Sequence, residues 1–216
     1  MKTLLVIKEG VHADTEMYIK AIKRGANKRN VKVVELDILN CSGVDLTEEI
    51  HSCDGIIAAE PISNVEGYKI SSFMTNHLYK DLDDFTACSP YFNCTLNGVI
   101  NALEERKVNL TGLDVCVIGR NLGLSIADYM RDEDATVQIC HSKTKNLKEK
   151  TIMADIVVCC ASSGKKILNP NMVKPTALVI DVGMNVEGDF KNIIDFKEIG
   201  RRNINNIFKK MGCDNE

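Results

Sequence analysis

Short apolar runs alternate along the chain with longer stretches in which apolar residues recur every three or four positions. Thr3–Ile7 is the first run, and Asp14–Arg29 follows it with Ile19, Ile22 and Ala26 on one helical face. Strands that alternate with helices form βαβ units, in which helices cover both faces of a parallel sheet. The pattern therefore predicts an α/β protein.

The alternation predicts seven strands and seven helices. The strands are Thr3–Ile7, Val31–Ile38, Asp54–Ala59, Asp114–Ile118, Ala135–Cys140, Asp155–Ala161 and Ala177–Val182. The helices are Asp14–Arg29, Leu46–Ser52 with Asp45 as its cap, Val65–Leu78, Thr95–Arg106, Leu124–Asp132, Leu147–Met153 and Asp195–Met211.

A loop over Lys80–Asn93 separates two blocks of this alternation. We expect two α/β domains with a cleft between them, a substrate domain over 1–93 and a Rossmann-like dinucleotide domain with a parallel sheet over 94–190. Residues 191–216 then form a C-terminal helix that packs back on the first domain.

Composition and charge exclude several classes of protein. The 216 residues are 44% hydrophobic and carry a formal net charge of −3, so no global field favours nucleic acid or an acidic membrane surface. No apolar run approaches the roughly 20 residues that span a bilayer. The N-terminal apolar run is too short for a signal peptide and reads as a buried strand, which predicts a cytoplasmic protein.

Nine cysteines and four histidines show no grouping typical of a metal site. The cysteine number is odd and no CxxC pair occurs, so we expect neither a disulfide framework nor bound metal. Cys116, Cys140, Cys159 and Cys160 lie in apolar runs and are predicted to be buried.

The segment Val117–Gly123, VIGRNLG, joins a predicted strand to a predicted helix. Gly119 and Gly123 would let the chain turn tightly and bring backbone N–H groups close to a phosphate at the helix N-terminus. The full G-x-G-x-x-G fingerprint is absent, so a simple tight turn is an equal alternative for this junction alone.

CHSKTKN, from Cys140, follows the next strand, where a Rossmann fold meets the adenosine ribose. An acidic residue there would favour NAD. Ser142, Lys143 and Thr144, with Arg120 from the first loop, instead suit the 2′-phosphate of NADP. The alternative is a solvated polar loop.

A third strand ends in VIDVGMN, with Asp181, Gly183 and Asn185 at its carboxyl end. Ligands of open α/β sheets gather outside the carboxyl ends of strands, so this loop is a candidate neighbour of the nicotinamide. A strand-terminating turn is the alternative.

Together these segments resemble the methylenetetrahydrofolate dehydrogenase/cyclohydrolase family. VIGR, ATVQICHSKTKNL, ADIVV and VKPTALVIDVGMN stand in that family's order and spacing over Leu113–Asn185. In the family, the Arg and Ser matched by Arg120 and Ser142 hold the NADP 2′-phosphate. The resemblance implies NADP as cofactor and these binding residues: Gly119, Arg120, Asn121, Gly123, His141, Ser142, Lys143, Thr144, Ala161, Gly183 and Asn185.

The first half resembles the family's folate domain less closely. Tyr18 matches the Tyr of the family helix, but Ile22 occupies the position of the Lys that drives both chemistries. Lys23 is adjacent but turned about 100° around the helix axis. Asp83, within KDLDD, matches the Asp that binds the pterin ring. Tyr18 and Asp83 are therefore the candidate catalytic residues.

Other family motifs are altered. Ala59 stands where the family has the Gln that assists the Lys, and Pro61 alone remains of the following Leu-Pro-Leu-Pro. Pro-Cys-Thr-Pro becomes Asn93–Leu96, and Gly-Lys-Pro becomes residues 162–164. The loop between Arg120 and Gly123 is about two residues shorter than usual, and the Pro-Gly-rich segment that lines the folate site is missing.

The resemblance implies an NADP-dependent methylenetetrahydrofolate dehydrogenase of one-carbon metabolism, acting on a tetrahydrofolate derivative as a homodimer. Without the Lys and the Gln, cyclohydrolase activity should be weak or lost, because general acid–base help is worth about 10²–10⁴-fold. Two alternatives stay open. One is an NADP-binding protein that no longer acts on folate, and the other is a dehydrogenase of a different small substrate.

Overall fold

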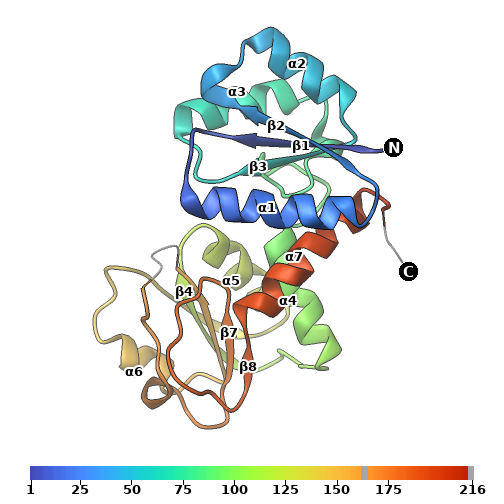
Figure 1. Cartoon of the computed structure of the whole chain (residues 1–216). Helices are drawn as coiled ribbons and strands as arrows, with labels where there is room; N and C mark the ends of the chain where they lie inside the picture. Colours follow the sequence, from blue (N-terminus) through green and yellow to red (C-terminus); the bar gives the residue numbers. More distant parts are fainter. Residues whose placement is uncertain (162–164, 214–216) are drawn as a thin grey trace. The chain divides into compact units, whose positions relative to one another are not determined.

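The computed structural model describes residues 1–161 and 165–213. The chain divides into two compact units, which are both of α/β type (Figure 1). The first unit contains Met1–Asn97 and the stretch from Asn203 onward, and the second contains Gly98–Arg202. Both sheets are parallel throughout, which confirms the predicted fold class.

The first unit has a three-stranded sheet in the order β2-β1-β3. Its strands are β1 (Thr3–Lys8), β2 (Lys32–Asp37) and β3 (Gly55–Ala59). Its helices are α1 (Ala13–Asn27), α2 (Gly43–Ser52) and α3 (Asn64–Met74). Helix α1 lies on one face of the sheet, and α2 and α3 lie on the other (Figure 1).

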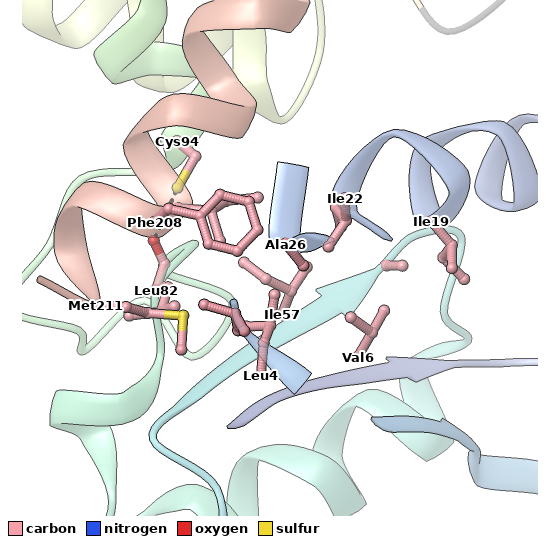
Figure 2. Close-up of a cluster of buried hydrophobic side chains, with 13 residues drawn as sticks. Leu4, Val6, Ile19, Ile22, Ala26, Ile57, Leu82, Cys94, Phe208 and Met211 are labelled. Carbon is pink, nitrogen blue, oxygen red and sulfur yellow. Dashed lines mark hydrogen bonds between the residues drawn. The ribbon is translucent and has the colours of Figure 1, made fainter. Parts of the chain in front are cut away.

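Strand β1 is buried on both faces, as a central parallel strand must be. Leu4 and Val6 point to one face, while Leu5 and Ile7 point to the other, because successive side chains alternate across a strand. The Leu4 face packs against α1 and the C-terminal residues of the unit, including Phe208 (Figure 2). Residues about 200 positions apart in sequence thus share one core.

Helix α2 begins earlier than predicted, and its cap differs. Ser42, not Asp45, is the cap residue: its hydroxyl accepts the Asp45 N–H at 3.2 Å. The Asp45 carboxylate accepts the Ser42 N–H in return, at 3.0 Å. This reciprocal pair is a capping box, which places Asp45 inside the first turn.

The second unit has a five-stranded sheet in the order β5-β4-β6-β7-β8. Its strands are β4 (Asp114–Gly119), β5 (Thr136–Cys140), β6 (Ile156–Cys160), β7 (Leu178–Asp181) and β8 (Ile193–Ile194). Helices α5 (Leu122–Asp132) and α6 (Leu147–Thr151) lie between strands in sequence. Strand β8 was not predicted, since two residues are too few to produce a periodic pattern.

Helices α4 (Cys94–Glu105) and α7 (Phe196–Lys210) each contribute residues to both units, since the divisions at Asn97 and Arg202 fall inside them. Three short 3-10 helices complete the description of residues 1–161 and 165–213: η1 (Ile38–Asn40), η2 (Leu78–Lys80) and η3 (Pro170–Met172). No helix in these residues is both long enough and apolar enough to cross a membrane.

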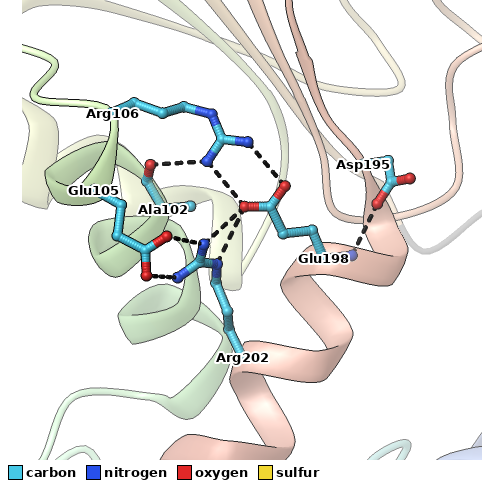
Figure 3. Close-up of polar contacts among 6 residues, drawn as sticks. All are labelled: Ala102, Glu105, Arg106, Asp195, Glu198 and Arg202. Carbon is cyan, nitrogen blue, oxygen red and sulfur yellow. Dashed lines mark hydrogen bonds and ion pairs between the residues drawn. The ribbon is translucent and has the colours of Figure 1, made fainter.

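Within the second unit, four charged side chains join α4 to α7 (Figure 3). Arg106 donates to both carboxylate oxygens of Glu198 at 2.9 Å each. Arg202 donates to both oxygens of Glu105, at 2.8 and 2.6 Å, and to Glu198 at 2.8 Å. The two arginines lower the pKa of Glu198 to about 2, chiefly through the Arg106 hydrogen bond.

The four cysteines predicted to be buried are buried. Cys116 and Cys140 lie on neighbouring strands with their sulfur atoms 3.7 Å apart, and all nine cysteines of the chain are free thiols. Burial raises the pKa of Cys160 to about 12, so this thiol stays protonated at neutral pH.

Candidate functional site

The turn after β4 has the form that the sequence predicted. Asn121 adopts φ +44°, and α5 begins at the next residue. A Cβ on Gly119 would lie 2.5 Å from the Cys160 sulfur, and one on Gly123 would lie 3.0 Å from it. Both glycines therefore let the turn pack directly on β6. Within the turn, the Gly123 N–H donates to the Arg120 carbonyl at 2.8 Å.

The loop after β5 folds on itself through its own polar groups. The His141 N–H donates to the Thr144 hydroxyl at 2.9 Å, and the Lys143 N–H donates to the His141 ring at 3.2 Å. Ser142 stays exposed, and the Arg120 guanidinium reaches its hydroxyl oxygen at 3.4 Å. Two loops that are 22 residues apart thus present a cation and a hydroxyl at one place.

The loops after β6 and β7 are held together by Asn185, whose side chain is fully buried. Its amide oxygen accepts the Ala161 N–H at 3.0 Å, and its amide nitrogen donates to the Lys165 carbonyl at 3.1 Å. A Cβ on Gly183 would lie 2.6 Å from the Ala161 carbonyl oxygen, so only glycine fits between the loops. The Asn185 side chain is thus used inside the protein, and residues 162–164 lie outside the described residues.

All four loops follow the carboxyl ends of parallel strands of one sheet. Strand β4 has β5 on one side and β6 on the other, which makes it the point where the strand order reverses. Ligands of doubly wound sheets bind outside this edge. This edge carries a glycine turn, a helix N-terminus and an Arg–Ser pair. These groups are suited to bind a dinucleotide that carries an additional phosphate.

A second group of polar residues lies in the first unit, around Tyr18. The Tyr18 hydroxyl donates to the Asn203 amide oxygen at 3.1 Å, and the Asn203 amide nitrogen donates to the Thr95 hydroxyl at 2.6 Å. Helices α1, α7 and α4 each supply one of these residues. The relay fixes the direction of the Tyr18 O–H bond and leaves its oxygen able to accept a hydrogen bond.

Asp83 belongs to the same group. Its carboxylate accepts the Cys94 N–H at 2.6 Å, and burial raises its pKa to about 6. Burial also raises the pKa of Tyr18 well above 10, and the Asp83 charge adds to that rise. The structure therefore brings the two predicted catalytic residues into one electrostatic environment.

Ile22 and Ala59 are both apolar and buried. Ile22 is fully buried and packs in the core with Leu4 and Ile57 (Figure 2). Lys23 points elsewhere and forms an ion pair with Glu35. The helix register inferred from the sequence is thus the one that the structure adopts.

Four residues of this group were not predicted as site residues: Asn203, Thr95, Cys94 and Lys210. Lys210 donates to the Leu82 carbonyl at 2.7 Å and contacts the Cys94 sulfur at 3.2 Å. A signal was present, because Asn203, Asn206 and Lys210 follow the i, i+3, i+7 spacing of one helical face. Asn203 and Asn206 are buried, so α7 carries a polar row on an otherwise apolar face.

Comparison with known proteins agrees with this geometry. Residues 93–210 match the family model of the tetrahydrofolate dehydrogenase/cyclohydrolase NAD(P)-binding domain. The bifunctional protein FolD of Thermodesulfovibrio yellowstonii is 34% identical over 203 residues, which cover 79% of this chain and 71% of that protein. The chain belongs to the tetrahydrofolate dehydrogenase/cyclohydrolase family.

Solved structures of this family share the fold. The Campylobacter jejuni bifunctional FolD enzyme matches with a TM-score of 0.78 and 24% identity, over 98% of this chain and 88% of that one. The Trypanosoma brucei enzyme, described as complexed with NADP cofactor and inhibitor, matches with a TM-score of 0.82 and 22% identity, over 98% and 86%. The family's NAD(P)-binding domain therefore corresponds to the part of this chain that carries the glycine turn and the Arg–Ser pair.

Proposed function

We propose that this protein is an NADP-dependent methylenetetrahydrofolate dehydrogenase whose cyclohydrolase activity is weak or lost. The observation that carries the proposal is the 3.4 Å approach of the Arg120 guanidinium to the Ser142 hydroxyl at the switch-point edge of the sheet. Both groups are exposed there, and both are suited to a phosphate.

The cofactor is held by the second unit. Arg120 and Ser142 would bind the 2′-phosphate, and the glycine turn with the α5 N-terminus would bind the pyrophosphate. Gly183 and Ala161 supply backbone groups beside the nicotinamide, in loops that Asn185 keeps in place. Bound NADP would supply the hydride acceptor for the oxidation of the substrate's methylene carbon.

The substrate is held by polar groups of the first unit. Asp83 accepts hydrogen bonds from N–H groups of the pterin ring, as the matching Asp does in the family, and the Tyr18 oxygen offers a second acceptor. Hydride transfer requires the protein to orient the substrate. Neither residue needs to activate water.

Ring opening of the methenyl group is a different case, because it needs water attack and proton movement. Ile22 and Ala59 offer no proton donor or acceptor where the family has Lys and Gln. General acid–base catalysis contributes about 10²–10⁴-fold, so a loss of this size is expected for the hydrolase step.

Isothermal titration calorimetry tests the proposal. NADP, NAD and tetrahydrofolate are titrated separately into the purified protein. We expect NADP to bind more tightly than NAD, and tetrahydrofolate to bind with a stoichiometry of about one per chain.

The apolar replacements at Ile22 and Ala59 favour a second candidate, an NADP-binding protein or a dehydrogenase that acts on another small substrate. Tight NADP binding with no detectable tetrahydrofolate binding would support this second candidate and contradict the first. A homodimer in the cytoplasm is the assembly that we propose for either activity, and sedimentation velocity measures its mass.

A further inference from the structure

Lys210, in the last turn of α7, is fixed by three acceptors. Its ammonium donates to the carbonyl oxygens of Leu82 and Phe92 and lies 3.2 Å from the Cys94 sulfur. A lysine ammonium has three donors, so all of them have a partner within the protein. This lysine is therefore placed to hold other groups in position.

The groups that Lys210 holds are the ones that position Asp83. Leu82 directly precedes Asp83, and the Cys94 N–H donates to the Asp83 carboxylate at 2.6 Å. The Cys94 sulfur also contacts the Leu82 carbonyl, at 3.1 Å. One ammonium thus links both backbone segments that determine where the Asp83 carboxylate points.

Lys210 also supplies the positive charge near Asp83. The titratable groups that face Asp83 are Tyr18 from α1, Cys94 from α4, Lys210 from α7 and Asp81 from its own segment. Burial raises the pKa of Asp83, and the Asp81 charge raises it further, whereas the Cys94 hydrogen bond and the Lys210 charge lower it. Among these neighbours Lys210 is the cation.

No lysine of α1 supplies the positive charge near Asp83. Ile22 stands at the family's Lys position and is buried in the core, and Lys23 is paired with Glu35. The cation of this polar group therefore comes from the other end of the chain. Lys210 belongs to α7, whereas the family resemblance implies a lysine on the helix that carries Tyr18.

We propose that Lys210 is a positioning residue for Asp83: it fixes the backbone around the carboxylate and keeps the carboxylate charged, and so ready to accept hydrogen bonds, at neutral pH. The benefit to substrate binding rests on the proposed function. The effect on Asp83 itself does not, and can be measured without any substrate.

Carbon-13 NMR titration of the Asp83 carboxyl in the full-length protein tests the proposal. Asp83→Asn identifies the signal. Replacing Lys210 by Gln keeps donors but removes the charge, and should raise the Asp83 midpoint by about one unit or more. Lys210→Arg retains the charge and should leave the midpoint within about 0.3 units. The matched control is Lys209→Gln, an exposed neighbour on the same helix.

An unmoved Asp83 midpoint in folded Lys210→Gln would overturn the proposal, as would an equal rise in the Lys209→Gln control. If circular dichroism shows that Lys210→Gln does not fold, the Asp83 midpoint in Lys210→Arg tests the proposal instead. A rise of a full unit in that variant, which keeps the charge, would contradict the proposed role.

Kinetics on the same proteins separate this inference from the proposed function. With methylenetetrahydrofolate and NADP, Lys210→Gln should raise KM about twofold at pH 7, change kcat little, and move the acid limb of kcat/KM to higher pH. A raised Asp83 midpoint in a protein that shows no dehydrogenase activity would support the positioning role and contradict the proposed function.

Discussion

The carboxyl group of Asp83 is buried, and burial favours its neutral form. Burial, the largest contribution, raises its pKa from the ordinary 3.8 to about 6, although Cys94 and Lys210 act in the opposite direction. A group whose pKa is higher in the folded state stabilises the fold at low pH, and this contribution is lost as the pH rises through the folded pKa. Asp83 therefore weakens the fold at the pH where it is charged.

Asp83→Asn should become more stable relative to the natural protein as the pH rises. Between pH 4 and pH 7 the difference in free energy of unfolding should grow by roughly 1–3 kcal/mol in favour of the variant, because the amide never ionises. Urea unfolding at several pH values measures this difference. A difference that is constant with pH would contradict the account of Asp83.

Arg120→Ala should change the choice of cofactor. Loss of the guanidinium should weaken NADP binding by roughly 1.5–3 kcal/mol, the worth of a hydrogen bond to a charged group, and leave NAD binding almost unchanged. Calorimetry with both dinucleotides gives the two values. Arg131→Ala removes an equal charge from the exposed end of α5 and should affect neither. An equal loss for both cofactors in Arg120→Ala would contradict the phosphate role.

Among the elements, α4 and α7 share a network of three ion pairs, and Glu198 takes part in two of them (Figure 3). The lowered pKa of Glu198 means that its contribution to stability is present above about pH 4.5 and is lost as the pH falls through about 2. Its side chain is 18% exposed, so solvent screens the network only in part.

Glu198→Gln should lower the free energy of unfolding by roughly 1–3 kcal/mol at pH 7, because two arginines lose a charged acceptor. The loss should shrink between pH 4.5 and pH 2. Chemical denaturation measures it, with Asp132→Asn as the control, since that exposed partner of Arg131 should cost under about 0.5 kcal/mol. An equal loss in the free energy of unfolding for the two variants would show that the network stabilises the fold no more than a surface ion pair does.

The sequence predicted elements well where an apolar pattern persists over several turns, as in α1 and α5. It predicted the start of α2 less well, because Ser42 and Asp45 both suit a cap and only the backbone geometry distinguishes them. It missed β8, whose two residues Ile193 and Ile194 belong to the sheet only through pairing with β7. Short elements depend on tertiary contacts that no local pattern records.

At the scale of the whole molecule, the cofactor loops were easier to predict than the substrate group. Each loop is a contiguous motif that directly follows a strand, so sequence order alone places Arg120 near Ser142. The group around Tyr18 instead joins residues that are up to 185 positions apart, such as Tyr18 and Asn203. Lys210 could not be assigned without knowing which helix face contacts Leu82.

The thiols report on the packing of both units. In the folded protein a thiol reagent should react rapidly with Cys88, which is exposed, and slowly with Cys53 and Cys116, whose pKa values burial raises. After denaturation all nine thiols should react. Reagent titration with mass spectrometry of the labelled peptides identifies the rapid site. Fast labelling of Cys116 would contradict the described core. Fewer than nine thiols in protein purified without air would contradict the prediction that the cysteines form no disulfide.

The most direct test of the account compares two rates on one preparation: NADP reduction with methylenetetrahydrofolate, and hydrolysis of methenyltetrahydrofolate after subtraction of the uncatalysed rate. We predict measurable NADP reduction, accumulation of the methenyl product, and hydrolysis at least about 10²-fold weaker than in the bifunctional FolD relatives. The double variant Ile22→Lys, Ala59→Gln should increase hydrolysis. No NADP reduction, or hydrolysis at a rate like that of those relatives and abolished by Lys23→Ala, would contradict it.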